Sequence, residues 1–314
     1  MRAKIVCFLF MLMMTAACSD NPAAPEPEPS PIASYETDQR RSKISINYSP
    51  YTNGLSPEKN SPIPLTLVEG HLELLDPYAS ALRLFGVTGE LEKIYQPAKE
   101  KYGFRIIAGC WIDKYMQESS IYKELDALIK LANDGWIDVA VVGSETLYRG
   151  DFPVEKLIEY IQYVRERIDD KAIPVTTSDT AQAWNNPELV AVCDVILVTI
   201  YPFFSEIPVE NAAGAMADTY EDVKVKANGK QVIISETGWP TAGSPEGAAI
   251  PSMENARRYF EDVYIWSLAE DVEVIFFSAF DEGWKNEGRK GDIGIHWGHF
   301  TADGRLKEAY LTIH

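Results

Sequence analysis

The stretch IDVAVVGSE, residues 137–145, joins a mostly apolar run to a glycine, a serine and an acid. A second stretch, VILVTIY at residues 195–201, has the same nearly continuous apolar character. Runs of this kind are typical of parallel strands, because helices cover both faces of a parallel sheet and leave no polar face. The two stretches therefore predict an α/β protein with a buried parallel sheet.

Similar runs recur along the chain with helical patterns between them. The eight predicted strands cover residues 43–48, 81–85, 104–111, 136–142, 172–177, 195–201, 231–235 and 274–280. Apolar residues three and four positions apart predict helices over 154–168, after a proline, and over 253–263. Eight such alternations favour a closed (β/α)8 TIM barrel over an open doubly wound sheet. No GxGxxG sequence follows the first strand, so nothing indicates a dinucleotide site.

Composition and charge narrow the classes of partner. The chain has 314 residues, of which 46% are hydrophobic and 24% charged, and a formal net charge of −18. This is the composition of a packed globular protein, and it excludes wholesale disorder and a polytopic membrane protein. Excess negative charge repels phosphate backbones, so we expect no nucleic-acid partner and a neutral ligand instead. With no CxxC or HExxH sequence, we expect no metal.

The first 17 residues have the order of a secretory signal. Arg2 and Lys4 precede an apolar run over 5–14, and small residues then lead to Cys18. The ending resembles a bacterial lipoprotein signal, so we expect export across the inner membrane and a lipid anchor at Cys18. The anchored protein would then lie in the periplasm or at the outer membrane or cell surface. An ordinary cleavage site, with Cys18 incidental, is the alternative.

The remaining chain divides into a tether and one barrel domain. Residues 18–41 are rich in Pro and Glu and are predicted to be a disordered tether, because they cannot bury enough apolar surface to fold. Residues 42–314 form the predicted barrel domain, and we expect a monomer. Within it, Cys110 and Cys193 fall in separate strand regions, which favours buried free thiols over a disulfide.

Two acids follow predicted strands at the end where barrel enzymes carry their active sites. Glu145 follows the fourth strand and Glu236 the seventh, each beside glycine and aromatic residues. Cleavage of a glycosidic bond requires two carboxylates in one cavity, one protonated and one ionised. The alternative is that both are solvated loop acids, as most of the 47 acids must be. Their matching positions favour catalysis.

Aromatic residues gather at the same strand ends. They are Trp111, Trp184, Tyr201, Phe203, Phe204, Trp239 and Trp284. Flat rings suit the apolar faces of sugars, whereas core packing is the alternative and is expected of Trp136 and Trp266. We predict that Trp239 and at least one of Trp111 and Trp284 stack on sugar units.

Short strings along the chain also carry a resemblance. They are SINYSP (45–50), LRLFG (82–86), VGSE (142–145), YPFF (201–204), SETGWP (235–240), FDEGWK (280–285) and HWG (296–298). In this order they resemble the landmarks of glycoside hydrolase family 17, the β-1,3-glucanases and related glucanosyltransferases. The resemblance spans about residues 43–314, and ETGWP is its most specific part. Ser144 stands where the family usually has Asn, and Phe85 where it often has Tyr.

The resemblance implies a retaining glycosidase that acts on β-1,3-glucan polysaccharide or oligosaccharide without a cofactor. It implies Glu145 as general acid and base and Glu236 as nucleophile, with Tyr201 near the nucleophile. The residues expected to bind substrate are Tyr48, Arg83, Trp111, Ser144, Tyr201, Trp239, Glu282, Trp284 and Lys285, of which Glu282 and Lys285 correspond to a charged pair. A glucanosyltransferase is one alternative. A glycan-binding lipoprotein without turnover is another, although the two intact acids argue against it.

Overall fold

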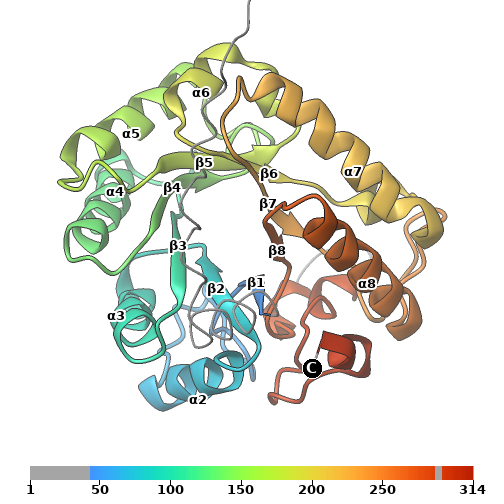
Figure 1. The fold of residues 1–314 in the computed structure, drawn as a ribbon. Helices are drawn as coiled ribbons and strands as arrows, with labels where there is room; N and C mark the ends of the chain where they lie inside the picture. Colours follow the sequence, from blue (N-terminus) through green and yellow to red (C-terminus); the bar gives the residue numbers. More distant parts are fainter. Residues whose placement is uncertain (1–42, 287–291, 314) are drawn as a thin grey trace, which may run out of the picture. The chain divides into compact units, whose positions relative to one another are not determined.

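Eight parallel strands close into a barrel with the helices outside it (Figure 1). The computed structural model describes residues 43–286 and 292–313. The strands are β1 (Ile44–Asn47), β2 (Ala79–Leu84), β3 (Arg105–Cys110), β4 (Val139–Ser144), β5 (Val175–Thr180), β6 (Ile196–Thr199), β7 (Val232–Thr237) and β8 (Val274–Phe276). Each strand pairs with the next along the chain, and β8 pairs with β1. The predicted (β/α)8 barrel is confirmed, and each predicted strand overlaps an observed one.

The helices connect successive strands and cover the outside of the barrel (Figure 1). They are α2 (Leu65–Leu75), α3 (Glu92–Glu100), α4 (Glu118–Asn133), α5 (Val154–Arg167), α6 (Pro187–Val192), α7 (Val209–Lys226) and α8 (Met253–Ala269). Local chemistry sets some of their starts. The side chain of Ser252 accepts a hydrogen bond from the N–H of Asn255 and caps α8, and Asn186 caps α6 in the same way. Pro153 is the residue before the first turn of α5.

The strands are buried on both faces, as their apolar sequences predict. One set of side chains fills the inside of the barrel and comprises Ala81, Ile107, Val139, Val141, Val195, Leu197, Ile233 and Ile275. The alternate side chains, such as Ala140 and Val142, join the larger core under the helices. The pairing register shifts near the carboxyl ends of β4, β6 and β7. Such shifts turn side chains at a barrel mouth, which is where the predicted site residues lie.

The cysteines and the two tryptophans that were predicted to pack in the core lie in it or against it. Cys110 and Cys193 are buried free thiols, as predicted. Trp136 and Trp266 are half-buried and pack against the core.

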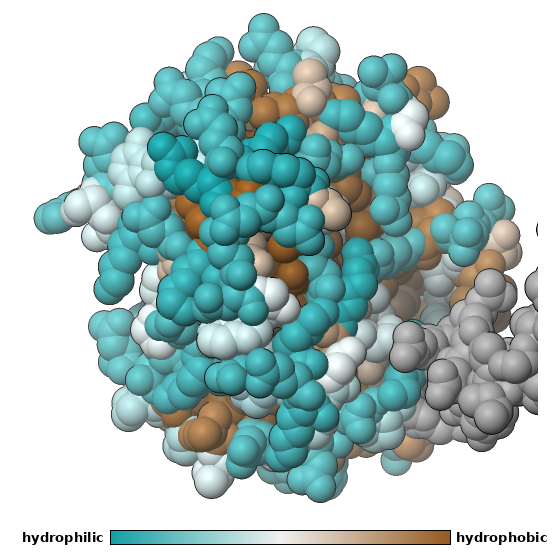
Figure 2. Space-filling view, turned by 60° about the vertical axis from the view of Figure 1, so that its left-hand side comes forward, coloured by the Kyte–Doolittle hydropathy of each residue, from teal (hydrophilic) through white to brown (hydrophobic). Residues whose placement is uncertain are grey.

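The face drawn in Figure 2 is mainly hydrophilic, with apolar residues in separate patches. Among the described helices, none is long and apolar enough to cross a membrane. The predicted signal peptide, tether and Cys18 lie outside the described residues.

Candidate active site

Glu236 is held at the mouth of the barrel by side chains from β2 and from the turn after β6. It lies near the end of β7 and is 7% exposed. Arg83 on β2 donates from Nη1 to Glu236 Oε1 at 2.7 Å, and the Tyr201 hydroxyl donates to Oε2 at 3.2 Å. Two donors on different oxygens fix the plane of this carboxylate and compensate its negative charge.

Arg83 connects four strands beneath the carboxylate. Its side chain is buried, with the residue 1% exposed. Its guanidinium also donates to Asn47 Oδ1 at 2.8 Å and to Ser144 Oγ at 3.0 Å. Ser144 Oγ in turn lies 3.4 Å from Glu236 Oε1. The predicted sugar contact of Arg83 is therefore corrected, because a buried guanidinium positions Glu236 and Ser144 instead of facing a ligand.

Asn47 is a member of this network that the sequence analysis missed. Its amide nitrogen donates to the carbonyl oxygens of Ser235, Ile275 and Phe276 at 3.1–3.2 Å. The sequence feature that could have indicated Asn47 is its position as a polar residue near the end of the first predicted strand, residues 43–48. Asn47 joins the first strand of the barrel to the last two and orients Arg83 at the same time.

Glu145 directly follows β4 and has a different environment. Its φ is +55°, in the left-handed region that few residues other than glycine adopt, and its N–H donates to Ser178 O at 2.7 Å. Burial, and then the negative charges of Glu236 and Asp179, raise the pKa of Glu145 to about 7. The carboxyl group therefore keeps its proton well above the pH at which an exposed glutamate loses it.

Asp179 on β5 is the second residue that the sequence analysis missed. Its carboxylate accepts hydrogen bonds from the backbone N–H groups of Leu147 at 2.8 Å and Tyr148 at 3.3 Å. It thereby holds the loop that begins at Glu145 while its charge acts on that acid. An acid two positions after the predicted strand at residues 172–177 was the signal that could have found it.

Two of the predicted sugar-binding rings belong to the core. Trp239 is 1% exposed and packs edge to face against Phe203, with ring centroids 5.1 Å apart. Its Nε1 donates to Ile250 O at 2.9 Å. Tyr48 is also 1% exposed and its hydroxyl meets His71 Nδ1 at 3.2 Å. The prediction of sugar contact is wrong for both rings, because protein atoms already cover them.

Trp111, Trp284 and Lys285 remain at least partly exposed. Trp111 is 41% exposed, and Trp284 is half-buried. Glu282 is buried, forms an ion pair with Lys285 and accepts a hydrogen bond from Trp284 Nε1 at 3.1 Å. The Lys285 ammonium lies 4.3 Å from the ring centroid of Phe277, which packs edge to face with Tyr201. This group therefore adjoins the Glu236 side of the site.

The site brings two carboxyl groups together in opposite electrostatic settings. Glu236 is paired with a guanidinium, whereas Glu145 is half-buried beside two negative charges. Such a pair can supply a charged nucleophile and a proton donor at one pH. In the part of the chain that the structure describes, no three His, Cys, Asp or Glu side chains come together as possible metal ligands.

The sequence of this chain is similar to those of known proteins. The sequence model of a family described as the BtgE/BtgC glycoside hydrolase domain matches residues 45–298. The chain belongs to this family. A glucan 1,3-beta-glucosidase of Arthroderma benhamiae is 32% identical to this BtgE/BtgC-type glycoside hydrolase over 232 residues, which is 67% of this chain and 73% of the relative. A probable glucan endo-1,3-beta-glucosidase btgC of Aspergillus fumigatus is 30% identical over 266 residues, 75% of this chain, but the match spans only 38% of that relative's length.

A solved structure extends the comparison to the fold. The glycoside hydrolase family 17 beta-1,3-glucanosyltransferase from Rhizomucor miehei superposes with a TM-score of 0.77 and 29% identity, covering 88% of this chain and 98% of that one. The resemblance of this BtgE/BtgC-type glycoside hydrolase to family 17 is therefore confirmed.

Proposed function

We propose that this protein is a retaining glycoside hydrolase that cleaves β-1,3-linked glucan through a covalent glycosyl-enzyme. Family membership supports the reaction class, and the names of the relatives support the substrate. The observation that carries the mechanism is the contrast between Glu236, paired with Arg83, and Glu145, whose pKa is raised to about 7. Two carboxylates suffice for this reaction, so no cofactor is invoked.

In the proposed mechanism Glu236 attacks the anomeric carbon while Glu145 protonates the departing glycosidic oxygen. Arg83 and Tyr201 keep the attacking carboxylate oriented. Formation of the ester consumes the negative charge of Glu236, which is one of the charges that raise the pKa of Glu145. The pKa of Glu145 therefore falls, so the carboxylate left after proton transfer stays ionised and can deprotonate the water that releases the sugar.

Variants of the two acids separate their roles. Glu145→Ala is expected to lose about 10²–10⁴-fold on laminarin and much less on β-laminaribiosyl fluoride, whose leaving group needs no proton. Added azide should restore its turnover as a β-glycosyl azide. Glu236→Ala should be nearly inactive on both substrates. Proton NMR of the first product from laminarin is the decisive measurement, because α-configured sugar would mean inversion and would remove Glu236 as nucleophile.

Transfer to a second glucan chain is the alternative fate of the glycosyl-enzyme. The observation that favours it is the likeness to the Rhizomucor miehei glucanosyltransferase. Chromatography of products at rising laminarioligosaccharide concentration measures the two outcomes, since transfer yields oligosaccharides longer than the substrate and hydrolysis does not.

We also propose that the enzyme is exported across the inner membrane and anchored to a membrane through diacylated Cys18. We propose further that it acts as a monomer and has no nucleic-acid partner. Small residues before Cys18 and the Pro/Glu-rich segment after it support this arrangement. One acyl chain binds a bilayer only marginally, so two or more are needed. Cys18→Ala should move the enzyme from the membrane to the soluble fraction. An intact mass without added lipid would contradict the anchor.

A further inference from the structure

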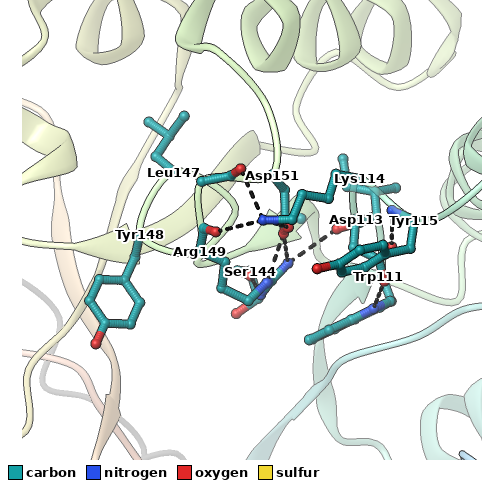
Figure 3. Close-up of polar contacts among 12 residues, drawn as sticks. Trp111, Asp113, Lys114, Tyr115, Ser144, Leu147, Tyr148, Arg149 and Asp151 are labelled. Atoms are coloured by element: carbon teal, nitrogen blue, oxygen red, sulfur yellow. Dashed lines mark hydrogen bonds and ion pairs between the residues drawn. The ribbon is translucent and has the colours of Figure 1, made fainter.

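An accessible indole lies on the loops that follow β3 and β4. Trp111 is the first residue after β3, and Arg149 comes from the loop between β4 and α5. The guanidinium carbon of Arg149 lies 4.4 Å from the centroid of the Trp111 ring. Figure 3 shows the indole beside this guanidinium, whereas Tyr148 points away on the other side. We call Trp111 together with its supporting Arg149 the indole shelf.

The indole shelf is held in place before any ligand arrives. Trp111 Nε1 donates to Asp113 Oδ2 at 3.0 Å, and Asp113 Oδ1 accepts from the N–H of Tyr115 at 2.8 Å (Figure 3). Arg149 is fixed in turn by Asp151, which accepts from its Nε at 2.8 Å. Since Trp111 is still 41% exposed, a fixed apolar ring is open to solvent. A ring that is already immobile loses little conformational entropy when a ligand stacks on it.

Arg149 also connects the indole shelf to the proposed acid. Its Nη1 donates to the carbonyl oxygen of Ser144, the residue before Glu145, and its Nη2 donates to Ile112 O at 3.2 Å. The contacts of Glu236 come instead from Arg83, Tyr201 and the hydroxyl of Ser144. The indole shelf therefore adjoins the acid, which in the proposed function meets the departing oxygen. The sugar that carries this oxygen must lie next to Glu145.

We propose that the indole shelf binds the glucan chain on the leaving-group side and, after the first step, holds the acceptor sugar for transfer. This inference rests on the proposed function. The departing glucan vacates the indole shelf, and a second neutral glucan stacks there in its place. Its hydroxyl oxygen attacks the anomeric carbon, its proton passes to Glu145, and the bond to Glu236 breaks. Without an acceptor on the indole shelf, water takes the same path.

The test keeps the donor constant and varies the acceptor. β-Laminaribiosyl fluoride forms the glycosyl-enzyme without placing a sugar on the leaving-group side. For Trp111→Ala the readout is the ratio of transfer to hydrolysis, because both reactions start from the same glycosyl-enzyme and their ratio does not depend on how fast it forms. With laminaribiose added, its ratio of transfer to hydrolysis should fall about tenfold, which is the size expected for the loss of one stacked ring. Trp111→Tyr keeps a flat ring and should restore part of the ratio.

A matched control comes from the opposite end of the barrel. Trp136 precedes β4, is half-buried, and has the Lys130 ammonium 5.2 Å from its ring. Trp136→Ala should leave the transfer ratio unchanged. An unchanged ratio in Trp111→Ala would overturn the role of the indole shelf, even if transfer and hydrolysis slowed together, because equal losses would mean that Trp111 acts through Glu145. A parent enzyme inactive on both the fluoride and laminarin would instead refute the proposed function.

Discussion

The pKa of Glu145 sets the upper pH limit at which this residue can act as an acid. Because the group must be protonated in the first step, we expect kcat/KM on laminarin to fall as the pH rises through about 7. Asp179→Asn removes one of the charges that raise this pKa, so the fall should begin at lower pH. A pH profile of each variant measures the shift, with the exposed helix residue Asp262→Asn as control. An identical profile for Asp179→Asn would contradict this source of the raised pKa.

The same carboxyl group has a second consequence, for stability. Its pKa in the folded protein, about 7, exceeds its ordinary value of 4.5, so folding disfavours the ionised form. The protonated group therefore adds to the free energy of unfolding in full below pH 4.5, and this addition is lost as the pH rises through about 7. Glu145→Gln should therefore unfold with a free energy about 1–3 kcal/mol higher than the parent at pH 8. Urea unfolding at pH 4 is the internal check, because the difference should vanish there.

At the scale of elements, Trp239 ties the segments around β7 together. It packs against Phe203 in the turn after β6 and against Tyr259 on α8. Trp239→Ala should lower the free energy of unfolding by about 3–5 kcal/mol, the usual cost of removing a buried aromatic ring. Trp111→Ala, at an exposed ring, is the control and should change it little. Urea unfolding measures both free energies. If Trp239→Ala proved as stable as Trp111→Ala, Trp239 would again be a candidate for sugar binding.

The two tryptophans also show how far the sequence could be interpreted. Apolar runs predicted all eight strands because both faces of each strand are buried, and the strand ends then indicated Glu145 and Glu236. Position after a strand could not distinguish a covered ring from an open one. That depends on Phe203 and Tyr259, which lie far from Trp239 in sequence. The role of Arg83 was hidden for the same reason, since its partners come from other strands.

At the scale of the whole molecule, the barrel closes where its first and last strands meet. β1 pairs with β8, and the Asn47 amide bonds three carbonyl groups of β7 and the β8 segment. Asn47→Ala leaves these groups short of a donor in the interior, so the free energy of unfolding should fall by about 1–3 kcal/mol. Activity should fall as well, because Arg83 loses a partner. Urea unfolding and laminarin assays measure the two losses, and Asn133→Ala, at an exposed residue, is the control. An Asn47→Ala variant with full stability and full activity would contradict the role of Asn47 in closing the barrel.

This closure has a consequence for how the enzyme comes into being. Arg83 and Glu236 are 153 positions apart in the chain, yet they share one hydrogen bond. A growing polypeptide that still lacks its seventh and eighth strands has neither its nucleophile nor the carbonyl groups that anchor Asn47. We therefore expect every truncated product of translation or proteolysis that ends before β7 to be inert towards glucan. The hydrolytic centre comes into existence only when nearly the entire barrel has been synthesised.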